Sequence, residues 1–159
     1  MVVLLSDIKL RIKSYSHLYN LDPSIVYGVC KTESNLNSFA MRYETGYKYL
    51  VDPKKVRPST CSINTESILQ KCSFGLMQVM GSVFREYGYA RWLSEIITDI
   101  DLQISYGCRH LSNKIKKYGL QKGIASYNSG SPRYDKNGKL ANQEYVDLVM
   151  GYTKEWKDE

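Results

Sequence analysis

The chain is organised around one short segment, Val26-Tyr27-Gly28-Val29-Cys30-Lys31-Thr32-Glu33-Ser34-Asn35. In and just before it, apolar side chains recur at helical spacing, at Ile25, Val26, Val29 and Cys30. The preceding Asp22-Pro23 supplies an N-cap residue and a proline for the first helical position, and both favour a helix start. The segment therefore predicts a helix that buries one face and carries Glu33 in its last turn.

Glu33 falls at an unfavourable end of this predicted helix. The C-terminal carbonyl groups of a helix carry partial negative charge, so a carboxylate there gains nothing from the helix dipole. One interpretation is a solvated surface residue, which is what most single glutamates at helix ends are. The other is a proton donor, because the dipole and apolar neighbours both raise the pKa of a carboxyl group.

Length and composition limit the class of protein. With 159 residues, 43% of them hydrophobic, the chain is predicted to form a single domain over residues 1–159. The net charge of +6 favours a polyanion such as nucleic acid, anionic lipid or an anionic cell-wall polymer. No helix-turn-helix pattern, aromatic-basic strand motif or metal finger accompanies this charge, so we expect no nucleic-acid partner. The 14 tyrosines suit a sugar-binding groove as well as ordinary packing sites.

The chain has four cysteines and two histidines. No two cysteines show CxxC spacing, so we expect no metal site. Cys30 and Cys108 fall on apolar helix faces and are predicted to be buried thiols. Cys61 and Cys72 flank a polar loop and could form a disulfide in an oxidising compartment.

The apolar run at the start of the chain is short. It spans only residues 1–5 and is followed by Ser6-Asp7, so it does not match a signal peptide. No other stretch approaches the length of a membrane span. We therefore expect synthesis in the cytoplasm, no stable membrane insertion, and delivery by another component if the target lies outside the inner membrane.

Helical periodicity continues through much of the chain. Besides the segment quoted above, it predicts helices over residues 6–19, 65–70, 79–87, 92–97, 99–119, 123–127 and 142–156. Ser6 or Asp7 is expected to cap the first of these helices, Asp99 the longest and Asn142 the last. The predicted fold class is mainly α.

Residues 37–71, called the flap below, show no strong periodicity. A loop of this length inside a compact domain is usually functional or disordered. Phe39, Tyr43, Tyr47 and Tyr49 favour an ordered flap, because disordered segments contain few aromatic residues. Any strands are expected within the flap.

Four short motifs follow one another along the chain. They are Glu33-Ser34, Gly75-Leu76-Met77-Gln78, Ala125-Ser126-Tyr127-Asn128-Ser129-Gly130 and Tyr145-Val146. In their order and their spacing to predicted helix ends, they resemble the lytic transglycosylase family with the soluble-transglycosylase catalytic domain, a relative of goose-type lysozyme. The resemblance covers residues 17–155 and implies a lysozyme-like α-helical domain with a long, partly irregular flap.

The resemblance also implies roles for individual residues near the acid. Glu33 would be the sole catalytic acid and base. Ser34 would orient Glu33 or touch the N-acetyl group of a sugar. Tyr145 would form a hydrogen bond near Glu33.

Residues of the other two motifs would line the substrate-binding groove. Met77 and Gln78 would line it beside the acid, and Tyr127 and Asn128 would contact the substrate next to the scissile bond. The family usually has Ala-Tyr-Asn or Ala-Ala-Tyr-Asn in the third motif. Here Ser126 is a small polar replacement that leaves Tyr127 and Asn128 in place.

Glycosidic bond cleavage usually requires two carboxyl groups, yet the motifs contain only Glu33. A single acid suffices if the N-acetylmuramic acid of the substrate supplies the remaining groups. The resemblance implies this route: a peptidoglycan lytic transglycosylase, without a cofactor, cleaves the β-1,4 bond to N-acetylglucosamine and leaves a 1,6-anhydro end. Alternatives are a hydrolytic lysozyme, in which Glu44 or Asp52 positions water, and a non-catalytic wall-binding or virion structural protein.

Two further segments, Met41-Arg42-Tyr43-Glu44 and Tyr106-Gly107-Cys108-Arg109-His110-Leu111, resemble small phage-encoded members of the family. They favour a phage endolysin or a virion-associated wall-degrading enzyme. We expect a monomer whose partners are peptidoglycan glycan strands, reached in the periplasm or cell wall.

Overall fold

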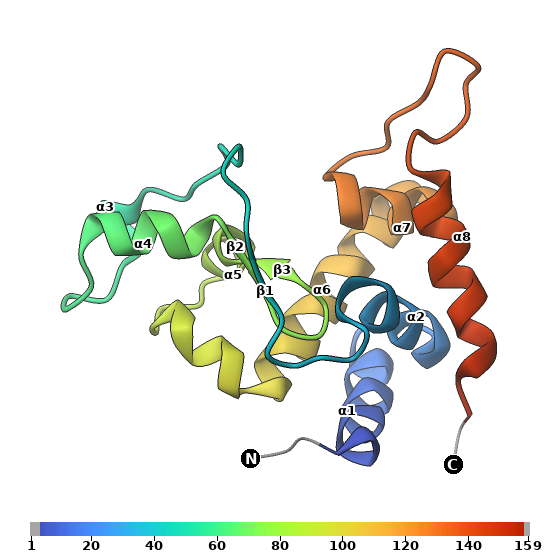
Figure 1. Cartoon of the computed structure of the whole chain (residues 1–159), viewed down its shortest axis with the longest axis horizontal. Coiled ribbons are helices and arrows are strands. Elements are labelled where there is room, and N and C mark those ends of the chain that lie inside the picture. The colour runs from blue at the N-terminus through green and yellow to red at the C-terminus, as the bar shows by residue number, and fades with distance from the viewer. Residues whose placement is uncertain (1–3, 158–159) are drawn as a thin grey trace.

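The computed structural model describes residues 4–157, which form helices and one small sheet (Figure 1). The α-helices are α1 (Leu5–Leu18), α2 (Pro23–Ser34), α3 (Pro53–Val56), α4 (Ile63–Gln70), α5 (Gly81–Glu86), α6 (Ile100–Tyr118), α7 (Leu120–Ser129) and α8 (Gln143–Tyr152). The 3-10 helices are η1 (Leu93–Thr98) and η2 (Thr153–Glu155), and the strands are β1 (Met41–Tyr43), β2 (Cys72–Phe74) and β3 (Val79–Met80). The predicted mainly α class is confirmed.

Helix α2 packs between α1 and α8, and α6 packs against α1 and α7 (Figure 1). Val26, Val29 and Cys30 of α2 are fully buried, as their spacing predicted. Gly28 lets α8 approach closely, because a Cβ atom at this position would clash with the backbone carbonyl of Val149. The close contact between α2 and α8 is what brings residues of the last helix to the acid.

Two of the predicted helix caps are confirmed. Asp22 accepts a hydrogen bond of 2.8 Å from the N–H of Ser24, and Asp99 caps α6. The predicted cap at Ser6 or Asp7 is wrong, because α1 begins at Leu5 and no side chain caps it. Asn142 also does not cap α8 with its side chain, which turns instead toward α7.

The sheet is antiparallel with strand order β1-β2-β3, and Met41 pairs with Phe74 while Ser73 pairs with Met80. The prediction that strands lie only within residues 37–71 is therefore wrong. The predicted start of a helix at residue 79 is also wrong, because residues 79 and 80 form β3 and α5 begins at Gly81. Gly75 and Gln78 have φ of 68° and 47°, and these left-handed residues turn the chain back into a hairpin before α5 begins. The predicted short helix at 92–97 is the 3-10 helix η1.

The flap is ordered, as its aromatic residues predicted, and it contains β1, α3 and α4. Helix α4 starts earlier than the sequence suggested, at Ile63, because the Ser62 side chain accepts a hydrogen bond from the N–H of Thr65. Cys61 and Cys72 are both free, buried thiols, so the disulfide considered above is not formed.

Helices across residues 4–157 are all too short or too polar to cross a membrane. Within the same range, histidines, cysteines and acidic residues form no group of three or more that could hold a metal ion.

Candidate active site

Glu33 lies in the last turn of α2. The helix ends there because Asn35 and Leu36 both adopt left-handed backbone conformations, with φ of 51° and 64°. Their N–H groups donate to the carbonyl oxygens of Lys31 and Cys30, which closes the helix. The Glu33 side chain is half-buried at this corner.

Tyr145 from α8 donates a hydrogen bond of 2.6 Å from its Oη to Oε1 of Glu33. The contact that the resemblance implied between these residues is thus present. The pKa of Tyr145 lies well above its ordinary value, first because the residue is buried and next because of the Glu33 charge. The phenol therefore stays a neutral hydrogen-bond donor to Glu33 at neutral pH.

The pKa of Glu33 is raised above its ordinary value, and burial is the largest cause. The hydrogen bond from Tyr145 and the positive charge of Arg42 both lower this pKa, but burial outweighs them. A raised pKa keeps a carboxyl group protonated to higher pH, which is what a general acid requires.

The Gly75–Gln78 turn is fixed beside Glu33 by side chains of other elements. Ser34 donates a hydrogen bond of 2.9 Å from Oγ to the carbonyl of Leu76. The N–H of Leu76 donates to Oε1 of Gln103, at 2.9 Å, and Gln103 is fully buried on α6. Only glycine fits at Gly75, because a Cβ atom there would clash with the Gln103 side chain. Ser34 thus ties the acid-bearing helix to the turn.

Tyr127 secures the same turn from α7. Its Oη donates a hydrogen bond of 2.6 Å to the carbonyl of Met77. The Met77 side chain is fully buried against Gly107, whose missing Cβ leaves room for it. Met77 was expected to line the groove. Its side chain lies in the core instead, and Met80 is part of the groove lining.

Gln78 lies in the groove lining, but its amide group binds protein atoms. Nε2 donates to the carbonyls of Ala40 and Gly75, at 3.0 and 2.8 Å, and Oε1 accepts from Oγ of Ser73, at 2.8 Å. Gln78 therefore connects the turn to the chain that leads into β1.

Asn128 lies exposed at the mouth of the groove. Its Oδ1 accepts a hydrogen bond of 3.1 Å from Nδ2 of Asn142, which also donates to the carbonyl of Ala125. Asn142 thus orients the Asn128 amide, a role that sequence reasoning did not assign to it.

His110 on α6 packs beside Tyr127 and is half-buried. The two rings lie 5.4 Å apart between centroids, and His110 Nδ1 is 2.9 Å from Oη of Tyr87. Burial, reinforced by the charge of Lys114, lowers the pKa of His110 to about 4. The imidazole is therefore neutral at neutral pH. No signal in the sequence indicated this packing role of His110.

A hollow of about 420 Å³ opens beside Glu33, within the size range of about 300–1,000 Å³ that is typical of ligand sites. Its lining residues come from α2 and α7 and from the flap and the sheet, and Figure 1 shows α2 and α7 to the right of the flap and the sheet. Its lining consists of Glu33, Arg42, Glu44, Gly46, Tyr47, Tyr49, Ser73, Gln78, Met80, Tyr127 and Asn128.

The flap contributes more of this lining than the motifs predicted. Arg42, Tyr47 and Tyr49 were not identified as site residues, and the aromatic content of the flap was the available signal. Glu44 lies in the hollow with its Oε1 3.9 Å from a guanidinium nitrogen of Arg42. Asp52, the other acid considered from the sequence, lies outside this lining and caps α3 through the N–H of Lys54.

Fold and site together define a helical domain in which a buried, hydrogen-bonded carboxyl group faces an open groove. The profile of the Transglycosylase SLT domain family matches residues 11–147, and the chain belongs to this family, with its lysozyme-like fold. It is a lytic transglycosylase, an enzyme that binds and degrades the glycan strands of peptidoglycan. No curated protein matches the chain.

Proposed function

We propose that Glu33 is the sole catalytic acid and base in non-hydrolytic cleavage of the β-1,4 bond between N-acetylmuramic acid and N-acetylglucosamine. The observation that carries this proposal is the half-buried carboxyl group with a raised pKa, hydrogen-bonded to Tyr145 at the edge of the hollow. Because its pKa is raised, this carboxyl group stays protonated to higher pH, and after it has donated its proton it can accept one.

In the first step, protonated Glu33 donates its proton to the glycosidic oxygen, and the bond from this oxygen to C1 of N-acetylmuramic acid breaks. The N-acetyl group of the same sugar stabilises the oxocarbenium-like centre. In the second step, the 6-hydroxyl oxygen bonds to C1 and its proton passes to the Glu33 carboxylate. The enzyme returns to its starting state, and the product carries a 1,6-anhydro ring.

The other motif residues support this chemistry from their observed positions. Tyr145 orients the carboxyl group of Glu33. Ser34, Gln78 and Tyr127 hold the turn that forms one wall of the groove. Asn128, exposed at the mouth, is the motif residue best placed to meet a sugar amide or hydroxyl group.

The test is the mass of the sugar ends released from purified sacculi by the wild-type protein and by Glu33→Gln. We expect anhydro ends, lighter by one water molecule than reducing ends, from the wild type and no release by the variant. Reducing ends from the wild type would overturn the anhydro route, and release by Glu33→Gln would overturn the role of Glu33.

One observation favours a second candidate, a hydrolytic lysozyme. Glu44 lines the same hollow as Glu33, so a second carboxylate is available to position water. Digestion in ¹⁸O-labelled water distinguishes the two, because only hydrolysis places solvent oxygen at the new sugar end.

We further propose that the enzyme acts in the periplasm or cell wall as a phage endolysin or virion-associated enzyme. The support is the resemblance of Met41–Glu44 and Tyr106–Leu111 to small phage-encoded family members. Added protein is expected to lyse bacteria whose outer barrier has been permeabilised. Failure to lyse such cells while sacculi are digested would overturn this assignment.

A further inference from the structure

The flap places two tyrosines in the hollow, on the wall opposite Tyr127 and Asn128. Tyr47 and Tyr49 pack edge to face, with ring centroids 5.7 Å apart and planes at 76°. The hydroxyl of Tyr47 is hydrogen-bonded to Oγ of Ser82 at 2.7 Å, which fixes Tyr47 against α5. Tyr49 is 75% exposed, so a large aromatic face points into solvent beside the groove.

The chain just after Tyr49 is held by a buried amide side chain. Oε1 of Gln70 accepts a hydrogen bond of 2.9 Å from the N–H of Val51, and Nε2 donates to the carbonyl of Val51 at 3.0 Å. Gln70 is fully buried on α4. Both backbone groups of Val51 are therefore satisfied by one side chain, and this fixes the flap two residues beyond Tyr49.

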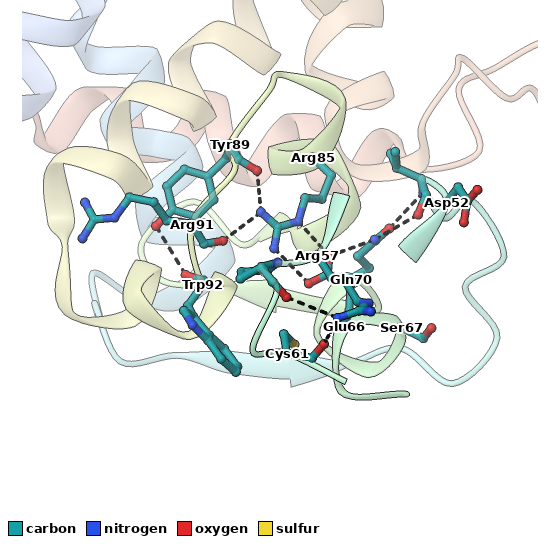
Figure 2. A network of polar contacts seen from close by, with 12 residues as sticks. Asp52, Arg57, Cys61, Glu66, Ser67, Gln70, Arg85, Tyr89, Arg91 and Trp92 are labelled. Carbon is teal, nitrogen blue, oxygen red and sulfur yellow. Dashed lines mark hydrogen bonds and ion pairs between the residues drawn. The ribbon is translucent and has the colours of Figure 1, made fainter. Parts of the chain in front are cut away.

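Gln70 is itself held by a buried ion pair, shown in Figure 2. Nε2 of Gln70 donates to Oε1 of Glu66 at 3.0 Å, and Glu66 accepts two hydrogen bonds from Arg85, of 2.7 and 2.9 Å. Arg85 also donates to the carbonyls of Tyr89 and Arg91. The flap is therefore anchored to α5 and to the segment that follows it by a continuous chain of polar contacts.

We propose that Tyr49, braced by Tyr47, is a glycan-binding subsite that stacks on a sugar ring of the strand away from the scissile bond, and that Gln70 is its positioning residue. An exposed, braced aromatic ring suits the apolar face of a sugar, because the ring loses little conformational freedom on binding. This inference rests on the proposed function for the identity of the ligand. It implies that the flap makes the enzyme prefer longer glycan strands.

The test measures binding rather than cleavage, in the Glu33→Gln background. The probes are N-acetylglucosamine oligomers of increasing length, titrated by calorimetry. We expect Tyr49→Ala to lose about tenfold in affinity for the longer oligomers and nothing for the shortest, because one stacking contact is removed. Tyr49→Trp should restore the loss.

Tyr134→Ala is the matched control. Tyr134 is also an exposed tyrosine, 52% accessible, in the loop before α8, and it is not part of the hollow. Its removal should leave binding unchanged. Equal affinity of Tyr49→Ala and its parent for every oligomer would overturn the inference, and so would an equal loss in Tyr134→Ala.

A double-variant cycle tests the role of Gln70. Gln70→Ala should weaken binding of the longer oligomers, while adding it to Tyr49→Ala should cause no further loss, because Gln70 acts through Tyr49. A purely structural role would instead weaken binding of all oligomers in both backgrounds. These measurements involve no turnover, so the two proposals can fail separately. If no anhydro product is found, only the proposed function is overturned. If Tyr49→Ala binds every oligomer as tightly as its parent, only the subsite is overturned.

Discussion

Among the residues that the structure describes, Glu33 and Glu66 have opposite surroundings. Glu66, fully buried on α4, receives two hydrogen bonds from the guanidinium group of Arg85. Glu33, at the end of α2, receives its hydrogen bond from the neutral phenol of Tyr145. A buried carboxylate next to a cation forms a structural anchor, whereas burial next to a neutral donor raises the carboxyl pKa and favours the protonated acid.

Glu33 lines the groove, whereas Glu66 lies outside the groove lining and anchors the flap on the opposite side through the contacts shown in Figure 2. Below, the Glu33 wall is the side formed by α2, α7 and α8 with their motif residues, and the Glu66 wall is the side formed by the flap and its anchoring contacts. Our proposals assign the chemistry to the Glu33 wall and the binding of distant sugar rings to the Glu66 wall. Variants in each wall should accordingly have different consequences.

The largest effect is expected for Glu33→Gln. Wall digestion should fall by at least about a thousandfold, because general acid and base catalysis is lost. The fold should be as stable at neutral pH as the wild type, or more so. Between the ordinary and the raised pKa of Glu33, the folded state binds more protons than the unfolded state, so the free energy of unfolding falls as pH rises through this window. The uncharged amide avoids this loss.

Turbidity of a sacculus suspension measures the activity of Glu33→Gln, and thermal melts below and above that pH window measure its stability. Near wild-type digestion would remove Glu33 from the mechanism. A variant less stable than the wild type at neutral pH would contradict the raised pKa.

Arg85→Met tests the other glutamate. Removing the cation leaves Glu66 buried and unpaired, so we expect a loss of about 3–5 kcal/mol in the free energy of unfolding. Urea denaturation measures it. The double variant Glu66→Leu with Arg85→Met should recover a large part of the loss, because no buried charge remains. A loss below about 1 kcal/mol in the single variant would show that the pair is not an anchor.

Gly28→Ala tests how the Glu33 wall is assembled. The added methyl group meets the backbone of Val149, so α8 must shift, at a cost of about 1–3 kcal/mol. Activity should fall with stability, because α8 carries Tyr145. Gly151→Ala, on α8 itself, is the control, since within residues 4–157 no atom beyond its chain neighbours and its own helix backbone lies within 4 Å of its Cβ position. Urea denaturation and the sacculus assay measure both variants, and equal behaviour of the two would contradict the role of Gly28.

Tyr145→Phe removes the hydrogen bond to Glu33 and keeps the ring. Because that bond lowers the pKa of Glu33, its loss raises this pKa further. The acid then stays protonated to higher pH, so the alkaline limb of the pH–activity profile should move to higher pH. The maximum rate should fall about tenfold, because the carboxyl group is less well oriented. An alkaline limb that moves to lower pH would contradict the assignment of Glu33 as the general acid.

Much of the Glu33 wall could be predicted from the sequence because its signals are local. The cap at Asp22 and the apolar spacing of α2 define the helix, and the motif order identifies its neighbours. Burial of Met77 could not be predicted, because it depends on Gly107 from a distant helix. The roles of Ser34 and Gln78 in binding backbone carbonyls likewise arise only when the turn is folded.

The Glu66 wall was largely hidden in the sequence. Glu66 and Gln70 are ordinary polar residues in the flap, which has no strong periodicity, whereas Arg85 lies on α5, so their pairing joins separate helices. The hairpin formed by β2 and β3 was missed because apolar residues 79–87 fit a helical spacing, while the left-handed conformation of Gln78 is not apparent from its residue type. Long-range polar contacts, rather than local propensity, shape this half of the molecule.

The smallest effect is expected for Glu44→Gln, which tests whether the flap wall takes part in the chemistry. If the substrate supplies the second group, removal of this carboxylate should change the rate by less than about threefold and leave the anhydro product unchanged. Rates on sacculi and the masses of the products measure both. A hydrolase that uses Glu44 to position water would instead lose about a hundredfold or more. Such a loss, together with solvent oxygen in the wild-type product, would place a catalytic group on each wall. It would contradict the assignment of chemistry to the Glu33 wall alone.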